Sequence, residues 1–261
     1  MERFKSIPPI LRCLIDKKVA LCYNKSKRSG INHGGNAMAR ALFESVLSEV
    51  FPFWGELSDG DKDYICQNTL AMSYPRGSNI HDGYECAGVY LVRSGCLRVY
   101  MLSEDGKEIT LYRLHGGDMC MLAASCVLQS VTFDVRIDAE ENSECYVIDG
   151  TAFALVSSRN PNVKIFALET AVERFSDVMW VMQQVLFMSM DRRLAIFLLD
   201  ESARIGSDTV KLTHEQIAKY MGSAREVVSR MLKYFSTEGI VEVSRGGIRI
   251  LDKKRLRSLA F

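Results

Sequence analysis

Apolar positions change their spacing along the chain, and each change indicates a different kind of structure. From Ala39 to Thr69 they recur at helical intervals. Residues 71–148 instead contain short runs rich in β-branched and aromatic residues, separated by turn signals such as Glu104-Asp105-Gly106. The predicted strands are GVYLVRSG, CLRVYML, EITLYRL, FDVRIDA and CYVID. Several short strands at this spacing predict an all-β barrel or a jelly-roll sandwich.

After Pro161 the helical period returns and persists for more than three heptads. Apolar residues alternate in steps of three and four, as in the contact stripe of a coiled coil. The dimer seam predicted from this pattern consists of Leu168, Val172, Phe175, Met179, Met182 and Leu186. The alternative is an amphipathic helix that packs only on its own domain.

The C-terminal part of the chain predicts two helices joined by a tight turn. The segment THEQ, beginning at Thr213, is a capping-box pattern in which Gln216 reaches back to the helix start. Ala218, Gly222 and Val228 then supply a small contact residue, a turn residue and a branched plug, as a helix-turn-helix requires. The segment IVEVSRGGIRIL follows and predicts a two-stranded wing around a Gly-Gly turn.

The second of these helices has a polar face that lies opposite its apolar face at 100° per residue. The polar residues are Arg225, Glu226, Ser229, Arg230 and Lys233. In a helix-turn-helix such a face enters the major groove, where Arg binds guanine and Glu accepts from cytosine. We also assign DNA contacts to Thr213 and Arg245, with Arg249 as a further candidate for phosphate. Two alternatives remain: a solvated face, and a capping box in which Ser223 pairs with Glu226.

Charge is distributed unevenly, although the net charge is only +1. Residues 191–261 hold 14 Lys and Arg against 9 Asp and Glu, whereas residues 38–190 hold 11 against 21. A basic module behind an acidic body is typical of a nucleic-acid-binding domain attached to a non-binding one. Eight cysteines without a dense pairing pattern, and no secretory signal or membrane span, predict reduced thiols in a cytoplasmic protein with no membrane partner.

The order of β-roll, long helix and winged helix-turn-helix resembles the Crp/Fnr family of bacterial transcription regulators over roughly residues 40–258. The likeness is strongest at LTHEQIAKYMGSAREVVSRMLKYFSTEGIV, and Ser229 fits the Glu-x-x-Ser-Arg pattern of the oxygen-sensing branch. The resemblance implies an α+β fold with an antiparallel β-roll (jelly-roll) sensor domain at 38–160, a dimerisation helix at 161–190 and a winged helix-turn-helix at 191–261. It also implies a homodimer that binds double-stranded palindromic DNA with TGTGA-like or TTGTGA-like half-sites, and RNA polymerase as a partner if the protein is an activator.

The sensor segment departs from the cyclic-nucleotide-binding members. After Gly117-Asp118 the chain reads MCMLAASCVLQSVTFDV, without the Gly-Glu and Arg-Ser pairs that hold ribose and phosphate. Cyclic AMP is therefore not the expected effector. The predicted effector pocket is formed by Cys120, Met121, Leu122 and Cys126. Its apolar lining favours a small hydrophobic ligand over a thiol redox switch.

Other readings of the sensor remain open. Its cysteines are more consistent with small buried hydrophobic residues than with a reactive site, and His81 and His115 are the available histidines for haem or a metal. Neither a typical iron–sulfur spacing nor a zinc spacing is present, so we predict no metal site and leave the cofactor unknown. A cupin-like, metal-dependent enzyme is the alternative function, but it lacks a clustered His/carboxylate set.

The first 37 residues lack sustained periodicity and are basic. Gly34-Gly35 lies just before Met38, where a ribosome-binding sequence would fall upstream of a start codon. We therefore expect either that translation begins at Met38 or that residues 1–37 form a disordered basic tail.

Overall fold

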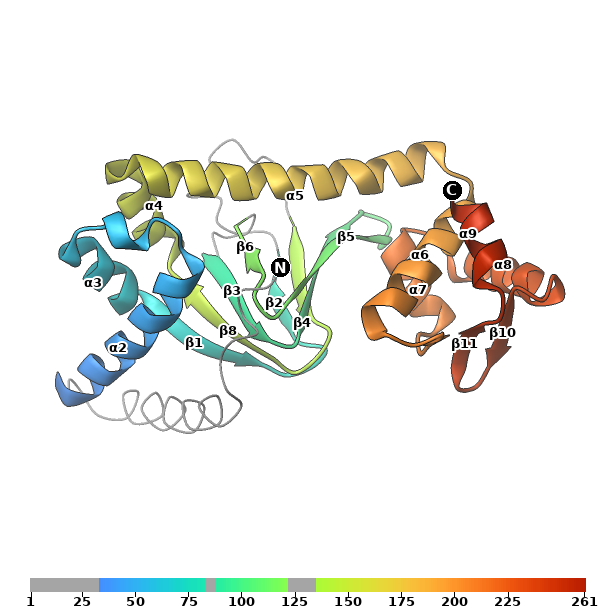
Figure 1. The fold of residues 1–261 in the computed structure, drawn as a ribbon, viewed down its shortest axis with the longest axis horizontal. Helices are drawn as coiled ribbons and strands as arrows, with labels where there is room; N and C mark the ends of the chain where they lie inside the picture. Colours follow the sequence, from blue (N-terminus) through green and yellow to red (C-terminus); the bar gives the residue numbers. More distant parts are fainter. Residues whose placement is uncertain (1–32, 83–87, 122–134) are drawn as a thin grey trace. The chain divides into compact units, whose positions relative to one another are not determined.

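The computed structural model describes residues 33–82, 88–121 and 135–261 (Figure 1). The predicted basic tail lies almost wholly outside the described residues, as do Leu122 and Cys126 of the predicted effector pocket. The described residues divide into two compact units. The first extends to Val99 and resumes at Arg113–Arg174, and the second contains Tyr100–Tyr112 and Phe175–Phe261.

Two four-stranded sheets form the β-roll. The first contains, in spatial order, β1 (Thr69–Tyr74), β8 (Ser143–Ile148), β3 (Val89–Ser94) and β6 (Met119–Cys120). The second contains β2 (Asn79–His81), β7 (Arg136–Ala139), β4 (Cys96–Leu102) and β5 (Glu108–His115). The printed pairings of the first sheet are all antiparallel. The predicted jelly-roll is thereby confirmed, as are four of the predicted strands and the described part of the fifth, FDVRIDA, whose first two residues lie outside the described residues.

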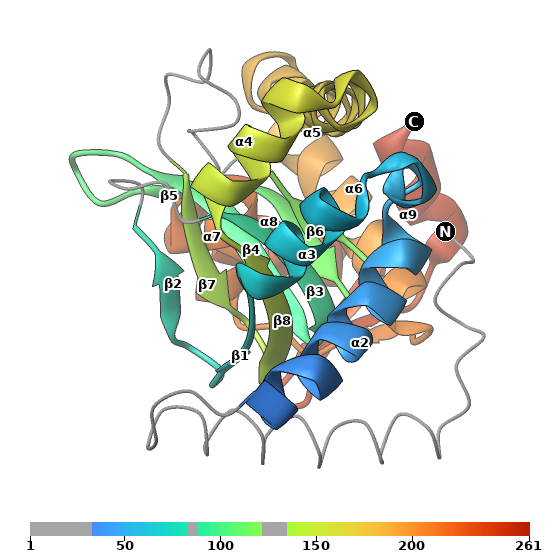
Figure 2. The ribbon, with the colours of Figure 1, turned by 90° about the vertical axis from the view of Figure 1, so that its left-hand side faces the viewer.

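Helices cover the first sheet, which explains why β3 is buried on both of its faces (Figure 2). They are α2 (His33–Val50), the short 3-10 helix η1 (Trp54–Glu56), α3 (Asp59–Gln67) and α4 (Gly150–Arg159). Phe43 of α2 meets Tyr146 of β8 edge-on, with ring centroids 5.5 Å apart. Helices α3 and α4 begin at side-chain caps, because Ser58 accepts from the Asp61 amide and Asp149 accepts from the Ala152 amide.

Helix α5 (Pro161–Phe187) is a single helix of 27 residues. Proline is well suited to its first position, where the missing amide proton has no helical acceptor to lose. Near its start α5 is anchored in an aromatic cluster, in which Phe166 contacts Phe51 and Phe53. The predicted seam side chains remain 42% to 64% exposed in the single chain; they are Leu168, Val172, Phe175, Met179, Met182 and Leu186.

The second unit has its own apolar core, built from α6 (Met190–Ile205), α7 (His214–Met221), α8 (Arg225–Thr237) and α9 (Lys253–Ala260). A three-stranded sheet of β10 (Val241–Ser244), β11 (Gly247–Ile250) and β9 (Thr209–Val210) completes it. Leu198, Val228 and Phe235 are fully buried in this core. Among the described residues, no helix combines the length and the apolar character needed to cross a membrane.

Candidate nucleic-acid interface

Helix α7 begins with the predicted capping box. The Gln216 amide donates to Thr213 Oγ1 at 3.1 Å, and the Thr213 amide donates to Gln216 Oε1 at 2.8 Å. Two amide donors at the helix start are therefore satisfied without a ligand. The box holds Thr213 at a fixed place on the surface, where its side chain remains exposed.

The turn between α7 and α8 has the geometry that the sequence predicted. Gly222 adopts the left-handed conformation with φ of 59°, which a residue with a Cβ rarely adopts. Ala218 is 4% exposed and Val228 is fully buried, so the small residue and the branched plug both lie in the helix contact. The Ser223 amide donates to the Ala218 carbonyl at 2.9 Å and closes the end of α7.

The proposed capping box at the start of α8 is wrong. The capping residue is Ala224, one position later than Ser223, and no side chain caps the helix. The amide of Ser223 is committed to the end of α7, so the backbone reaches the helical conformation only after Ala224. Glu226 is exposed in the first turn, and its carboxylate is not spent on a capping bond.

The polar face of α8 divides into two parts. Its four charged residues are exposed: Arg225, Glu226, Arg230 and Lys233. Ser229 is half-buried, and its Oγ lies 2.8 Å from Nδ1 of His214, the first residue of α7. His214 was not predicted from the sequence, because the contact joins residues 15 positions apart on two different helices. The available signal in the sequence was that His214 directly follows Thr213, the residue that caps α7.

The predicted wing is a regular antiparallel hairpin. Val241 pairs with Ile250 and Ser244 with Gly247, which places Arg245 in the connecting turn. Arg249 donates from Nε to Glu242 Oε2 at 2.9 Å, so this candidate for phosphate already has an acidic partner on the neighbouring strand. Arg245 is exposed at the tip and is the better-placed cation.

A cleft of about 670 Å³ lies between the start of α7 and the wing. His214 and Gly246 contribute to its lining, and its charged lining residues are Lys211, Glu215, Arg225 and Arg245. Three cations against one carboxylate make the cleft attractive to an anion such as a DNA phosphate. Thr213 also lines the cleft, so three residues assigned to DNA from the sequence, Thr213, Arg225 and Arg245, meet at one place.

The described part of the predicted effector pocket is buried. Cys120 and Met121 are fully inaccessible, and Cys120 pairs with Tyr90 across β6 and β3. Burial, followed by neighbouring groups that include Tyr74 and Cys120, raises the pKa of Tyr90. Two of the four residues of the predicted effector pocket are therefore buried, beside a tyrosine whose hydroxyl stays protonated.

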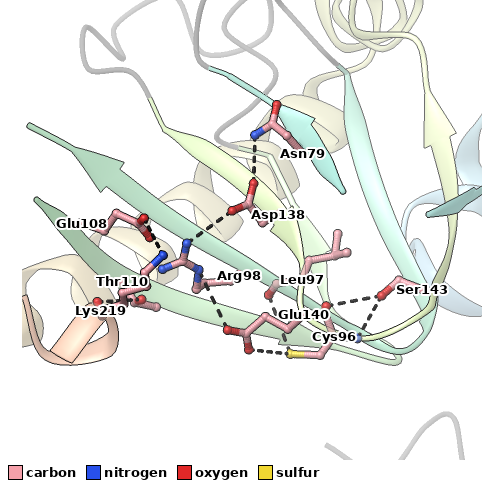
Figure 3. A network of polar contacts seen from close by, with 10 residues as sticks. All are labelled: Asn79, Cys96, Leu97, Arg98, Glu108, Thr110, Asp138, Glu140, Ser143 and Lys219. Carbon is pink, nitrogen blue, oxygen red and sulfur yellow. Dashed lines mark hydrogen bonds and ion pairs between the residues drawn. The ribbon is translucent and has the colours of Figure 1, made fainter. Parts of the chain in front are cut away.

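The neighbouring thiols are also buried and protonated. Burial and the nearby Glu140 raise the pKa of Cys96 to about 12, and its Sγ donates to Glu140 Oε2 at 3.6 Å (Figure 3). Burial and the nearby Glu144 raise the pKa of Cys145 to about 12. A thiol with such a pKa is a poor nucleophile at neutral pH, so these two cysteines behave as small apolar residues.

Arg98 is a charged group inside the roll, with 6% of its surface exposed. Its Nη2 lies 3.3 Å from Asp138 Oδ2 and its Nε lies 3.9 Å from Glu140 Oε1 (Figure 3). Asn79 donates to the other oxygen of Asp138 at 2.9 Å. Two carboxylates therefore compensate the guanidinium, which disfavours a role for Arg98 as the anchor of an anionic effector. The described residues contain no group of three His, Cys, Asp or Glu side chains placed to hold a metal.

Known protein families match segments in both units of the chain. Residues 192–259 match the Crp-like helix-turn-helix domain, and residues 72–160 match the cyclic nucleotide-binding domain. A Crp/Fnr-family protein of Eubacterium rectale with a known crystal structure is 44% identical, with a TM-score of 0.77 over 81% of this chain and 98% of that one. The chain belongs to the Crp/Fnr family of transcription regulators.

Two curated relatives match along nearly their whole length. The "Probable transcriptional regulator flp" of Lacticaseibacillus casei is 27% identical over 81% of this chain and 97% of its own. The "Cyclic AMP receptor protein" of Thermus thermophilus is 24% identical over 80% and 97%. As a Crp/Fnr member the chain is a DNA-binding regulator, and the cupin-like enzyme considered from the sequence is excluded.

Proposed function

We propose that this Crp/Fnr regulator is an effector-responsive homodimer that binds a palindromic operator with TGTGA-like or TTGTGA-like half-sites. The observation that carries the proposal is the exposed charged face of α8, which stands beside a cationic cleft at the wing. An amphipathic helix held in a helix-turn-helix, with arginines on its outer face, is suited to the major groove.

The exposed residues take different roles in this proposal. Arg225 and Arg230 bind guanine O6 and N7, and Glu226, free of a capping bond, accepts from cytosine N4. Lys233 contacts phosphate, as do Thr213 and Arg245 at the cleft.

The dimer is proposed to form along α5. Six large apolar side chains on one side of this helix are 42% to 64% exposed, although each would be more stable away from water. Their spacing in steps of three and four is the contact pattern of paired helices. A second copy of the same face buries them symmetrically, which is the simplest closed arrangement for identical chains.

The effector is proposed to be a small apolar molecule rather than a cyclic nucleotide. The segment after Gly117-Asp118 lacks the Gly-Glu and Arg-Ser pairs, and Cys120 and Met121 are apolar and fully buried. The compensated Arg98 offers no replacement for the missing phosphate partner. Effector binding is proposed to shift a pre-existing equilibrium between two dimer conformations, with RNA polymerase as a further partner if the protein activates transcription.

Selection from a random duplex library tests the DNA-binding part of the proposal. The protein should enrich palindromes, and the logarithm of its affinity should fall linearly with the logarithm of the salt concentration. At fixed salt, the selected duplex should bind at least about 10³-fold more tightly than random duplex. Enrichment of single, non-repeated sites, or equal affinity for selected and random duplex, would overturn the proposed operator.

A further inference from the structure

The side chains of His214 and Ser229 form a polar contact between the two helices of the helix-turn-helix. His214 Nδ1 and Ser229 Oγ are 2.8 Å apart, and both residues are half-buried. The other polar residues on the outer face of α8 are charged and exposed. Ser229 differs from them, because the orientation of its hydroxyl is set by the side chain of His214.

The hydroxyl of Ser229 has one proton, and the state of His214 decides where that proton points. A neutral imidazole with its proton on Nε2 accepts at Nδ1, so Ser229 donates to it and presents only lone pairs elsewhere. An imidazolium donates at Nδ1 instead, so Ser229 accepts from it and its own proton is released. At 2.8 Å either form makes a good hydrogen bond.

The cleft that His214 lines also contains four charged side chains. They are Glu215 on α7, Lys211 before it, Arg225 on α8 and Arg245 in the wing. Lysine, arginine and glutamate side chains ordinarily keep their charge between pH 6 and pH 8, whereas histidine is the side chain that changes charge in this range.

We propose that His214 is a positioning residue for base reading, which determines whether Ser229 donates to DNA or only accepts from it. With neutral His214, Ser229 favours a base that offers a donor, such as the N4 amino group of cytosine or N6 of adenine. With charged His214, Ser229 also donates to guanine O6 and N7 or thymine O4. Base preference at one position of each half-site then depends on pH. This inference rests on the proposed operator binding by α8.

The experiment measures base preference at two pH values. Symmetric single-base-pair variants of the duplex selected by the wild-type protein are titrated at pH 6 and pH 8, at constant salt. For wild type, the affinity ratio of two bases at one position should change about five-fold between these pH values, equivalent to one neutral hydrogen bond. At the other positions the ratio should stay constant.

Three variants separate the roles of the two residues. Ser229→Ala should remove the preference at that position at both pH values. His214→Gln retains a hydrogen-bonding side chain but does not titrate, so the preference should persist and become independent of pH. Glu104→Gln removes an exposed charge that is not part of the cleft lining, and this control should show the wild-type pH dependence.

Two results would overturn the inference alone: a wild-type preference independent of pH at every position, or a His214→Gln protein that keeps the wild-type pH dependence. In both cases operator binding itself would stand. Failure of the wild-type protein to enrich any palindrome would instead overturn the proposed function, and this inference with it. The Ser229→Ala protein tests the contact independently if His214→Gln does not fold.

Discussion

At the scale of single residues, the charged side chains on the outer face of α8 are exposed and do not cap their own helix. Arg225 and Arg230 are exposed, and Glu226 makes no capping bond to the helix start. A side chain that is not needed to hold its own helix is available to a base edge. Ser229 differs, because the imidazole of His214 already occupies one side of its hydroxyl.

Removing either arginine should cost specific binding. Arg225→Ala or Arg230→Ala is expected to weaken binding to the selected duplex by about 1–3 kcal/mol and to relax the preference at one base pair per half-site. Fluorescence anisotropy with single-base-pair variants of the duplex measures both effects. Lys233→Ala is the matched control, because loss of a phosphate contact should weaken all duplexes about equally. Wild-type affinity in both arginine variants would show that α8 is not the reading helix.

Buried thiols should resist alkylation in the folded protein. With pKa values raised to about 12 from the ordinary 9.0, Cys96 and Cys145 are protonated at pH 8. The thiolate fraction at pH 8 is about 10³-fold lower than at the ordinary value, and the greater intrinsic nucleophilicity of a more basic thiolate offsets only part of this.

Iodoacetamide labelling at pH 8, mapped by mass spectrometry, is therefore expected to be at least about ten-fold slower at Cys96 and Cys145 in the folded chain than in urea. The sign for stability follows from the same shift. The raised pKa favours the folded state below pH 9 and loses this contribution as the pH rises from 9 towards 12. Equal labelling rates in the folded and unfolded chains would restore these cysteines as redox candidates.

At the scale of elements, α5 combines an anchored start with an exposed apolar stripe. Phe166 lies in the aromatic cluster with Phe51, and Val163 and Ala167 are buried, so the beginning of the helix is fixed within the first unit. The seam residues that follow are not needed for this anchorage. Their exposure in the single chain is the reason why we propose an interface between chains at this stripe.

Charges in the stripe should separate the proposed dimer. Met179→Glu/Met182→Glu places like charges opposite their own copies, and the chain is expected to sediment as a folded monomer with reduced operator affinity. Met179 and Met182 are 42% and 47% exposed, so the fold of the single chain should tolerate the change. Gln184→Glu, on the opposite side of the helix at 100° per residue, is the control and should remain dimeric. A double variant that still sediments as a dimer would place the interface elsewhere.

At the scale of the whole molecule, the match to a cyclic nucleotide-binding domain does not by itself assign a nucleotide as the ligand. Residues 72–160 share that domain's sequence pattern, while the residue pairs that hold ribose and phosphate are missing after Gly117-Asp118. A fold is retained through its buried residues, whereas a ligand is retained only through the few side chains that touch it.

Cyclic AMP and cyclic GMP should therefore leave the thermal unfolding temperature unchanged. A ligand at 1,000 times its dissociation constant stabilises the folded state by about 4 kcal/mol, which raises the midpoint by several degrees in a protein of this size. Differential scanning fluorimetry at millimolar nucleotide would detect this effect. A clear rise at micromolar concentrations of either nucleotide would contradict the apolar pocket.

The sequence predicted best those features that repeat or that depend on neighbours in the chain. Strand runs, the trio Ala218, Gly222 and Val228, and the Thr213 capping box all follow from local spacing. The wrong prediction at Ser223 arose because this residue fits both the turn after α7 and a capping box with Glu226. In the structure its amide donates to the Ala218 carbonyl at the end of α7. The His214–Ser229 and Arg98–Asp138 contacts join distant segments, so no local pattern announces them.

Because α5 is one continuous helix, only certain insertions and deletions keep its apolar stripe on one side. Its 27 residues carry the exposed apolar stripe on one side. One inserted residue turns every later side chain by about 100° and splits the stripe into two that face different ways. Seven inserted residues turn it by about 700°, which is about 20° short of two full turns, so the stripe continues. Insertions and deletions in this helix should therefore be accepted when they bring the stripe back to the same face, as seven or eleven residues do, whereas a change of one residue requires that the later apolar positions be rewritten.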